Sequence, residues 1–162
     1  MKKIAIYAES KNELIEDTTF ELISKAKELA DFAKKSYNID IKITTLLISP
    51  DVSEESVRNA FRAGSNKFVL IKNDAFFNFN QITYTSAFLS YYNKNPQDFI
   101  LFPATPTGRM VAPRVTTVLE TGLVADCTGL DFVIKDNELK LAATRPTFGA
   151  ELMATILAWK SP

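Results

Sequence analysis

Residues 4–8 read Ile-Ala-Ile-Tyr-Ala, a continuous apolar run close to the amino terminus. A strand buried on both faces of a parallel sheet has this pattern, because it lacks the polar alternation of a half-exposed strand. A helical pattern follows over about residues 19–36, and Thr18 with Glu21 fits the capping box that would begin this helix. The sequence therefore starts with a predicted buried strand and a long amphipathic helix.

The same order of strand and helix repeats along the chain. Further strands are predicted at residues 39–48, 68–71 and 99–102, and further helices from residue 51 to Gly64 and over about residues 80–93. Strands that alternate with helices favour a parallel sheet with helices on both faces and right-handed crossovers. The predicted fold class is a Rossmann-like, three-layer α/β fold.

The pattern changes after residue 122. Residues 131–135 and 138–142 flank Asp136-Asn137, which predicts a β-hairpin, and residues 152–159 are interpreted as a further strand. We expect these antiparallel strands to extend the parallel sheet at one edge. The chain contains no evident linker or repeat, so we expect residues 1–162 to form a single domain.

Composition argues against several classes of function. Nineteen basic and nineteen acidic residues give zero formal net charge, which argues against a nucleic-acid partner. The absence of His excludes His-based catalytic triads and His-ligated metal sites, and the lone Cys127 cannot form an internal disulfide or a thiolate metal site. Without a His to act as base, Cys127 is expected to be a buried structural residue.

The chain also lacks a segment suited to membrane insertion. No apolar run reaches the roughly 20 residues that cross a bilayer, and the run after Met1-Lys2-Lys3 is too short for a signal peptide. We therefore expect a cytoplasmic protein.

Two loops follow predicted parallel strands, at the edge where open sheets bind ligands. The first, residues 9–12, lacks the glycine-rich dinucleotide fingerprint, and the chain has no Walker A sequence. The second contains Thr107, Gly108 and Arg109, which would offer backbone N–H groups and a positive charge to an anion. In the competing interpretation, Thr107 caps the next helix and Arg109 pairs with a carboxylate. Pro113 should kink this helix or mark a later start.

Two further charged residues are candidates for binding. Asp126 is expected to order a loop through its side chain. Arg145 places a fixed cation after the predicted hairpin, where it would bind a phosphate or a partner's carboxylate, or else form a structural ion pair.

The second half of the chain contains four distinctive clusters of residues. They are Ala104-Thr105-Pro106-x-Gly108-Arg109, Ala112-Pro113-Arg114, Thr121-Gly122-Leu123-x-Ala125-Asp126-Cys127-Thr128, and Arg145-Pro146-x-Phe148-Gly149-x-x-Leu152-Met153-Ala154-Thr155-Ile156. In order and spacing these clusters resemble the signatures of the amino-terminal domain of the electron transfer flavoprotein α subunit. The resemblance runs from the first predicted strand to the end of the chain. It departs locally, since Met110 stands where the family commonly has Asp.

The resemblance implies a Rossmann-like domain that pairs with a β subunit of similar fold. In this family the heterodimer carries electrons from flavin dehydrogenases to a downstream acceptor, and a separate carboxyl-terminal domain holds FAD. That domain is expected to be absent from residues 1–162, so no flavin-binding residue is carried over and no cofactor is expected on this chain alone. We expect no catalytic residues and a docking and structural role, with Arg109, Arg114, Asp126 and Arg145 as partner-interface candidates.

A second hypothesis is a stand-alone, adenine-nucleotide-binding module of Rossmann-like fold. The loop from Thr105 to Arg109 would then hold the phosphates, with Thr107, Gly108 and Arg109 as candidate cofactor-binding residues. The glycine-poor loop after the first strand argues against this hypothesis.

Overall fold

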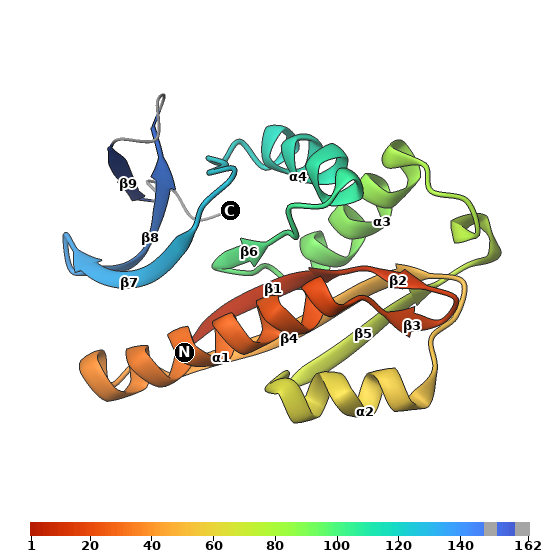
Figure 1. Cartoon of the computed structure of the whole chain (residues 1–162), viewed down its shortest axis with the longest axis horizontal. Coiled ribbons are helices and arrows are strands. Elements are labelled where there is room, and N and C mark those ends of the chain that lie inside the picture. Colours follow the sequence, from red (N-terminus) through yellow and green to blue (C-terminus); the bar gives the residue numbers. More distant parts are fainter. Residues whose placement is uncertain (148–151, 158–162) are drawn as a thin grey trace.

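A four-stranded parallel sheet forms the centre of the protein (Figure 1). The computed structural model describes residues 1–147 and 152–157. The strands lie in the order β5-β4-β1-β6 and comprise β1 (Lys2–Ala8), β4 (Ile41–Ser49), β5 (Lys67–Lys72) and β6 (Phe99–Leu101). In the register, Ile4 lies opposite Ile43 on one side and Phe99 on the other. The apolar runs predicted as interior strands therefore occupy the two central positions.

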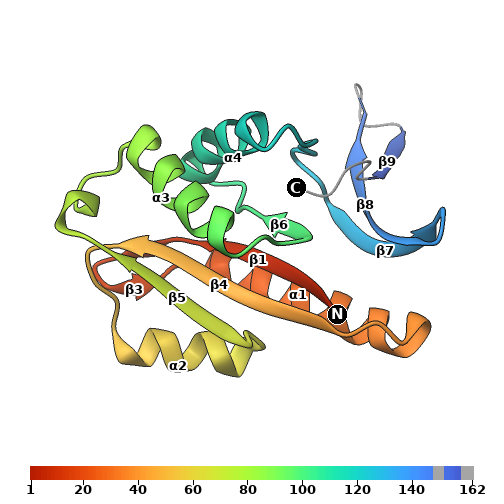
Figure 2. The same cartoon turned by 180° about the vertical axis from the view of Figure 1, so that it is seen from behind.

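Helices cover both faces of this sheet, which confirms the predicted fold class. Helices α1 (Asp17–Tyr37) and α2 (Glu54–Ala63) lie on one face, and α3 (Gln81–Lys94) and α4 (Pro106–Val118) lie on the other. Side chains of β1 alternate between the two layers, so that Ile4 packs in the α1 and α2 core while Tyr7 packs in the α3 and α4 core. Figure 2 shows the same three layers from behind.

The start of α1 differs from the predicted capping box. The N-cap residue is Glu16, its side chain makes no capping hydrogen bond, and Thr18 lies inside the first turn. A short hairpin of β2 (Ser10–Lys11) and β3 (Leu14–Ile15) returns the chain to β1, and the Glu16 N–H donates to the Glu9 carbonyl at 2.9 Å. This tertiary contact fixes where the helix begins, so a local cap is not needed.

The other helix boundaries follow local sequence signals. Ser53 caps α2 by accepting the Ser56 N–H, and Gly64 ends it with a φ of 124°. Asn80 caps α3 by accepting two N–H groups of the first turn. The end of α2 and the start of α3 agree with the expected positions, because each cap is made by residues within a few positions of the helix. Helix α2 begins at Glu54, three residues later than predicted.

The carboxyl-terminal strands form a sheet of their own. This sheet contains β7 (Gly129–Lys135), β8 (Glu138–Pro146) and β9 (Met153–Leu157), all antiparallel. The predicted hairpin is present, and its turn residues Asp136 and Asn137 have φ values of 53° and 61°. The predicted last strand also covered residues 158 and 159, which lie outside the described residues.

One detail of the expected fold is corrected, because in the described part of the chain these strands do not pair with an edge of the parallel sheet. They pack against it by one apolar face instead. The buried ring of Phe132 lies 4.9 Å from that of Phe99 on β6, and the Tyr37 hydroxyl of α1 donates to the Phe132 carbonyl at 3.3 Å. An alternating strand has only one apolar face to bury, and in β7 Phe132 on that face packs against α1 and Phe99 of β6.

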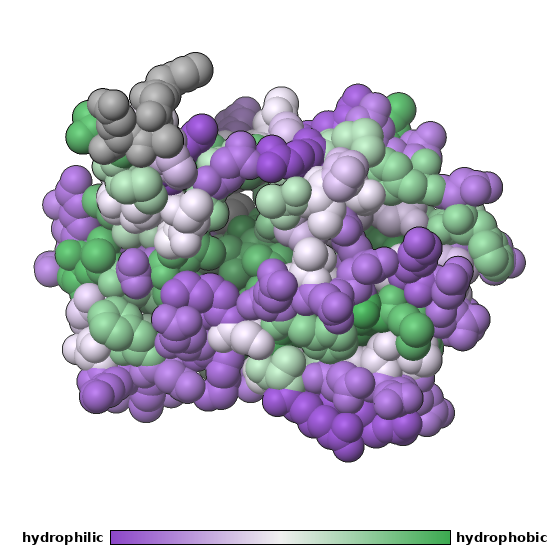
Figure 3. All heavy atoms as spheres, in the orientation of Figure 1, coloured by the Kyte–Doolittle hydropathy of each residue, from purple (hydrophilic) through white to green (hydrophobic). Residues whose placement is uncertain are grey.

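Hydropathy is uneven over the surface. None of the helices in the described ranges combines the length and apolar character that a bilayer span requires. Figure 3 shows apolar side chains in a hollow between the antiparallel sheet and β6.

Replacing Phe132 with Ala should destabilise the fold by about 3–5 kcal/mol, because it removes the aromatic ring that joins the two sheets. Urea denaturation measures this change. Phe77→Ala is the control, since Phe77 is 75% exposed and its loss should change stability by less than about 0.5 kcal/mol. Equal effects of the two changes would contradict the packing described for Phe132.

Candidate functional site

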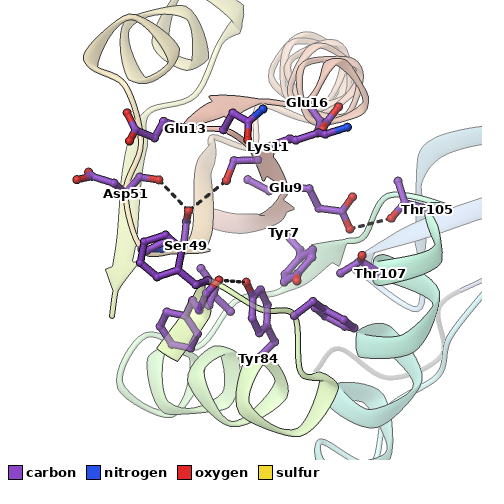
Figure 4. Close-up of a pocket in the computed structure, with 18 of the residues that line it drawn as sticks. Tyr7, Glu9, Lys11, Glu13, Glu16, Ser49, Asp51, Tyr84, Thr105 and Thr107 are labelled. Atoms are coloured by element: carbon purple, nitrogen blue, oxygen red, sulfur yellow. Dashed lines mark hydrogen bonds between the residues drawn. The ribbon is translucent and has the colours of Figure 1, made fainter. Parts of the chain in front are cut away.

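An open cleft of about 1,230 Å³ lies at the carboxyl edge of the parallel sheet (Figure 4). The ends of β1, β4 and β5, the β2–β3 hairpin and the first turn of α4 line it, together with the segment around the short helix η1 (Asp74–Phe76). The cleft brings together the two loops that the sequence marked as candidates, residues 9–12 and residues 105–107. Ligands of open parallel sheets bind at this edge.

The walls of the cleft are mostly acidic and aromatic. Its acidic residues are Glu9, Glu13, Glu16, Asp51 and Asp74, its basic residues are Lys11 and Lys72, and its aromatic residues are Tyr7, Phe76, Phe77, Phe79 and Tyr84. Lys72 donates to Asp51 at 2.7 Å, and this hydrogen bond holds the pKa of the Asp51 carboxyl below its usual value. One of the two cleft cations is therefore already neutralised.

Thr105 joins the first loop to the second. It is the N-cap of α4, and its Oγ1 accepts the Gly108 N–H at 3.0 Å. The same hydroxyl donates to Oε1 of Glu9 at 2.7 Å (Figure 4). This corrects the competing interpretation that Thr107 caps the helix, because Thr107 is the second residue of α4 and lines the cleft.

Glu9 is a half-buried carboxyl group at the centre of this arrangement. Burial raises the pKa of Glu9, although the hydrogen bond from Thr105 and the nearby Gly108 amide act in the opposite direction. The main chain of Glu9 is also held, since its N–H donates to Oγ1 of Thr19 at 3.1 Å. Sequence reasoning did not select Glu9 as a site residue, although it directly follows the first buried strand.

Tyr7 forms the floor of the cleft below Glu9 (Figure 4). Its ring packs against those of Phe88 and Phe102, at centroid distances of 6.3 and 5.2 Å. Burial, with the Glu9 charge as a smaller cause, raises the pKa of Tyr7 far above its usual value. The residue therefore stays a neutral phenol at any physiological pH.

Gly108 permits a tight approach between α4 and the end of β6. A Cβ atom at this position would lie 2.1 Å from the Pro103 carbonyl oxygen, so no other residue fits without movement of the main chain. Pro106 occupies the first turn, where a missing N–H is tolerated, and the helix continues through Pro113 to Val118. Pro113 therefore lies inside the helix and does not mark a later helix start, which was one of the two expectations for this residue.

The structure brings three of the four partner-interface candidates together. Arg109 donates from Nη2 to Asp126 Oδ1 at 2.5 Å, and its Nε donates to the Ala104 carbonyl. The Arg109 hydrogen bond, supported by the charge of Arg145, holds the pKa of Asp126 below its usual value. Asp126 has a φ of 57°, and its carboxylate binds Arg109 on α4. Arg114 is exposed further along α4.

Cys127 is half-buried and lies apart from the cleft. It lines a smaller apolar groove of about 160 Å³ beside β6. Over residues 1–147 and 152–157, no group of three or more acidic or Cys side chains is placed to hold a metal ion.

The cleft does not fit the pyrophosphate of a dinucleotide such as FAD. In a fold of this type the pyrophosphate lies at a helix N-terminus beside a glycine-rich turn. Here the Glu9 carboxylate lies at the N-terminus of α4, and the β2–β3 hairpin stands in place of the turn. Arg109, the cation that the sequence suggested for binding an anion, forms an ion pair with Asp126.

Comparisons with known proteins agree with the resemblance. The family model described as electron transfer flavoprotein domain matches residues 4–162. The electron transfer flavoprotein subunit alpha of Thermoanaerobacterium thermosaccharolyticum is 37% identical over 155 residues, which cover 96% of this chain and 44% of that protein. Protein FixB of Azorhizobium caulinodans is 31% identical over 157 residues, covering 96% and 40%. The acryloyl-CoA reductase electron transfer subunit beta of Anaerotignum propionicum is 29% identical, covering 96% and 46%. The chain thus spans less than half the length of these relatives.

Gly108→Ala should destabilise the protein by about 1–3 kcal/mol, because the new methyl group would overlap the Pro103 carbonyl. Chemical denaturation measures the change. Gly122→Ala is a matched control, since an added Cβ there meets no atom within 4 Å, and it should be neutral or slightly stabilising. A neutral Gly108→Ala variant would show that the helix start is loosely packed.

Glu9→Gln should raise the Tm at pH 7.5 by on the order of 2 °C. Because burial raises the pKa of Glu9, stability is highest while this carboxyl is protonated and falls as the pH rises through its folded-state pKa. Gln removes that loss, so the Tm difference should shrink at pH 4. Glu16→Gln, an exposed carboxyl on the same cleft, is the control in differential scanning fluorimetry. A lower Tm for Glu9→Gln than for wild type at pH 7.5 would contradict this assignment.

Proposed function

Because this chain belongs to the electron transfer flavoprotein family, we propose that it is the amino-terminal domain of an α subunit and serves docking and structural support there. Its partner is a β subunit, and the heterodimer carries electrons from flavin-dependent dehydrogenases to a downstream acceptor. The observation that supports electron transfer is the family match over residues 4–162, together with relatives that are named electron transfer subunits.

FAD supplies the one- and two-electron chemistry in this proposal. We place its binding site mainly outside residues 1–162. The carboxylate at the N-terminus of α4 supports this placement, since it opposes a pyrophosphate at the edge of the sheet where a dinucleotide would otherwise bind.

We propose that the docking surface lies on the outward face of α4 and the adjoining loop. Arg109, Asp126 and Arg145 provide fixed charges there, and Arg114 extends the charged face along the helix. Exposed apolar side chains lie among these charges, notably Met110 (41% exposed) and Val118 (62%). Apolar groups surrounded by a charged rim are typical of protein interfaces. The proposed occupant is the β subunit.

Dehydrogenase partners and a cytoplasmic location belong to the same proposal. The dehydrogenases would meet the assembled heterodimer, because electrons leave and enter through its flavin. Nothing in this role requires chemistry from residues 1–162 themselves, so we propose an electron-carrier subunit and not an enzyme.

Arg109→Glu and Arg145→Glu should each weaken association with the β subunit by about tenfold, because each reverses a charge on the proposed docking surface. Analytical ultracentrifugation of the mixed subunits measures the dissociation constant. Arg62→Glu is the control, since Arg62 is exposed on α2, on the opposite side of the sheet from α4.

A charge swap separates docking from folding. Arg109→Glu combined with Asp126→Arg restores an ion pair within the chain but leaves the surface charge at residue 109 reversed. If the swapped protein still binds weakly, the charges at residues 109 and 126, both on the proposed docking surface, contact the partner. If association returns to the wild-type value, Arg109 acts only within its own chain and the proposed docking role of this residue is wrong.

A further inference from the structure

The N-terminus of α4 opens into the cleft at the carboxyl edge of the sheet. The first N–H groups of a helix have no partner in the preceding turn and carry a partial positive charge, so this position favours an anion. In this protein an anion is present there, and it belongs to the chain. It is the Glu9 carboxylate, which accepts a hydrogen bond from the Thr105 hydroxyl and lies close to the Gly108 amide.

We propose that Glu9 is the built-in occupant of this anion position and sets the selectivity of the cleft against phosphate groups. This inference goes beyond the proposed function, because it concerns which ligands the cleft can accept and not how the subunit docks. Its premises are the position of one carboxylate and the hydrogen bonds that hold it.

The chain holds Glu9 in place from both sides. Its N–H donates to Thr19 at the start of α1, and its carbonyl accepts the Glu16 N–H. Its side chain is bound to the cap of α4 through Thr105. The main chain of Glu9 is thus fixed to the start of α1, and its carboxylate is held at the start of α4 by the Thr105 hydroxyl.

A phosphate that approached the first turn of α4 would meet this carboxylate beside the N-cap residue Thr105. Like charges that share a partly buried site repel strongly, because water screens them poorly there. The nearby carboxyl groups Glu13 and Glu16 add to the repulsion, and Lys72 is already paired with Asp51. Of the two cleft cations, Lys11 is then left to attract an anion, and it is exposed on the hairpin.

Two of the loop residues that the sequence suggested for binding a phosphate already form hydrogen bonds within the chain. The Gly108 N–H is bound by Thr105, and Arg109 is bound by Asp126. Thr107 lines the cleft, yet it lies beside the carboxylate. A nucleotide phosphate would therefore have to displace internal hydrogen bonds as well as the charge of Glu9.

The test is to empty the position and measure binding of inorganic phosphate and AMP to the 162-residue chain. Glu9→Ala should bind inorganic phosphate at least tenfold more tightly than wild type in isothermal titration calorimetry at pH 7.5 and constant ionic strength. Wild type should show no saturable binding up to about 10 mM. AMP should follow phosphate, since the proposal concerns the phosphate group.

Two controls separate the position from general charge. Glu16→Ala removes an acidic group from the same cleft without vacating the α4 N-terminus, so it should not gain binding. Glu9→Gln removes the charge but keeps a side chain of the same size in place, so its gain should be smaller than that of Glu9→Ala. Circular dichroism confirms folding, and Glu9→Ser replaces Glu9→Ala if the latter does not fold.

Three outcomes would overturn the proposal. They are saturable phosphate binding by wild type, no gain in either Glu9→Ala or Glu9→Ser, and an equal gain in Glu16→Ala. None of these outcomes depends on the β subunit, so failure here leaves the docking proposal unaffected.

Discussion

Burial of β1 on both faces is the constraint from which the rest of the molecule follows. Ile4 and Ile6 pack toward α1 and α2, while Tyr7 packs toward α3 and α4, so both helical layers are anchored on a single strand. A parallel strand in this position must be followed by a chain that leaves at the ligand-binding edge of the sheet. That geometry places Glu9 between the start of α1 and the start of α4. The shape and charge of the cleft are thus consequences of how the centre of the sheet is built.

Much of the fold could be predicted because its signals are local. The apolar runs in β1 and β4 and the glycine that ends α2 are signals carried by neighbouring residues. The prediction for the start of α1 was wrong, since Glu16 is positioned by a hydrogen bond to the end of β1 and not by its own helix. The antiparallel strands were predicted correctly, but their pairing with an edge of the parallel sheet was not. The alternation of apolar and polar residues shows which face of a strand is apolar and leaves open what that face packs against.

The site was less predictable for the same physical reason. Thr107, Gly108 and Arg109 were selected from a local pattern of small, polar and basic residues. The hydrogen bond that organises the cleft joins Glu9 to Thr105, which are 96 positions apart. One available signal was the place of Glu9 directly after the first buried strand, at the edge where ligands bind. Two of the four interface candidates, Arg109 and Asp126, form an ion pair in the structure. That the four residues contact a β subunit stays a prediction.

The pairing of β1 with β6 has a consequence for how the chain folds as it is synthesised. Residues 1–72 contain β1, β4, β5, α1 and α2, so one helical layer and three of the four parallel strands can assemble on the ribosome first. The opposite face of this intermediate exposes Tyr7, Leu46 and Ile48, whose covering helices come later in the chain. Because Ile4 pairs with Phe99, the last strand of the sheet also joins late. Until α3 and α4 have been synthesised, no helix is available to cover this apolar face of the sheet, and exposed apolar surface of this kind is prone to aggregation.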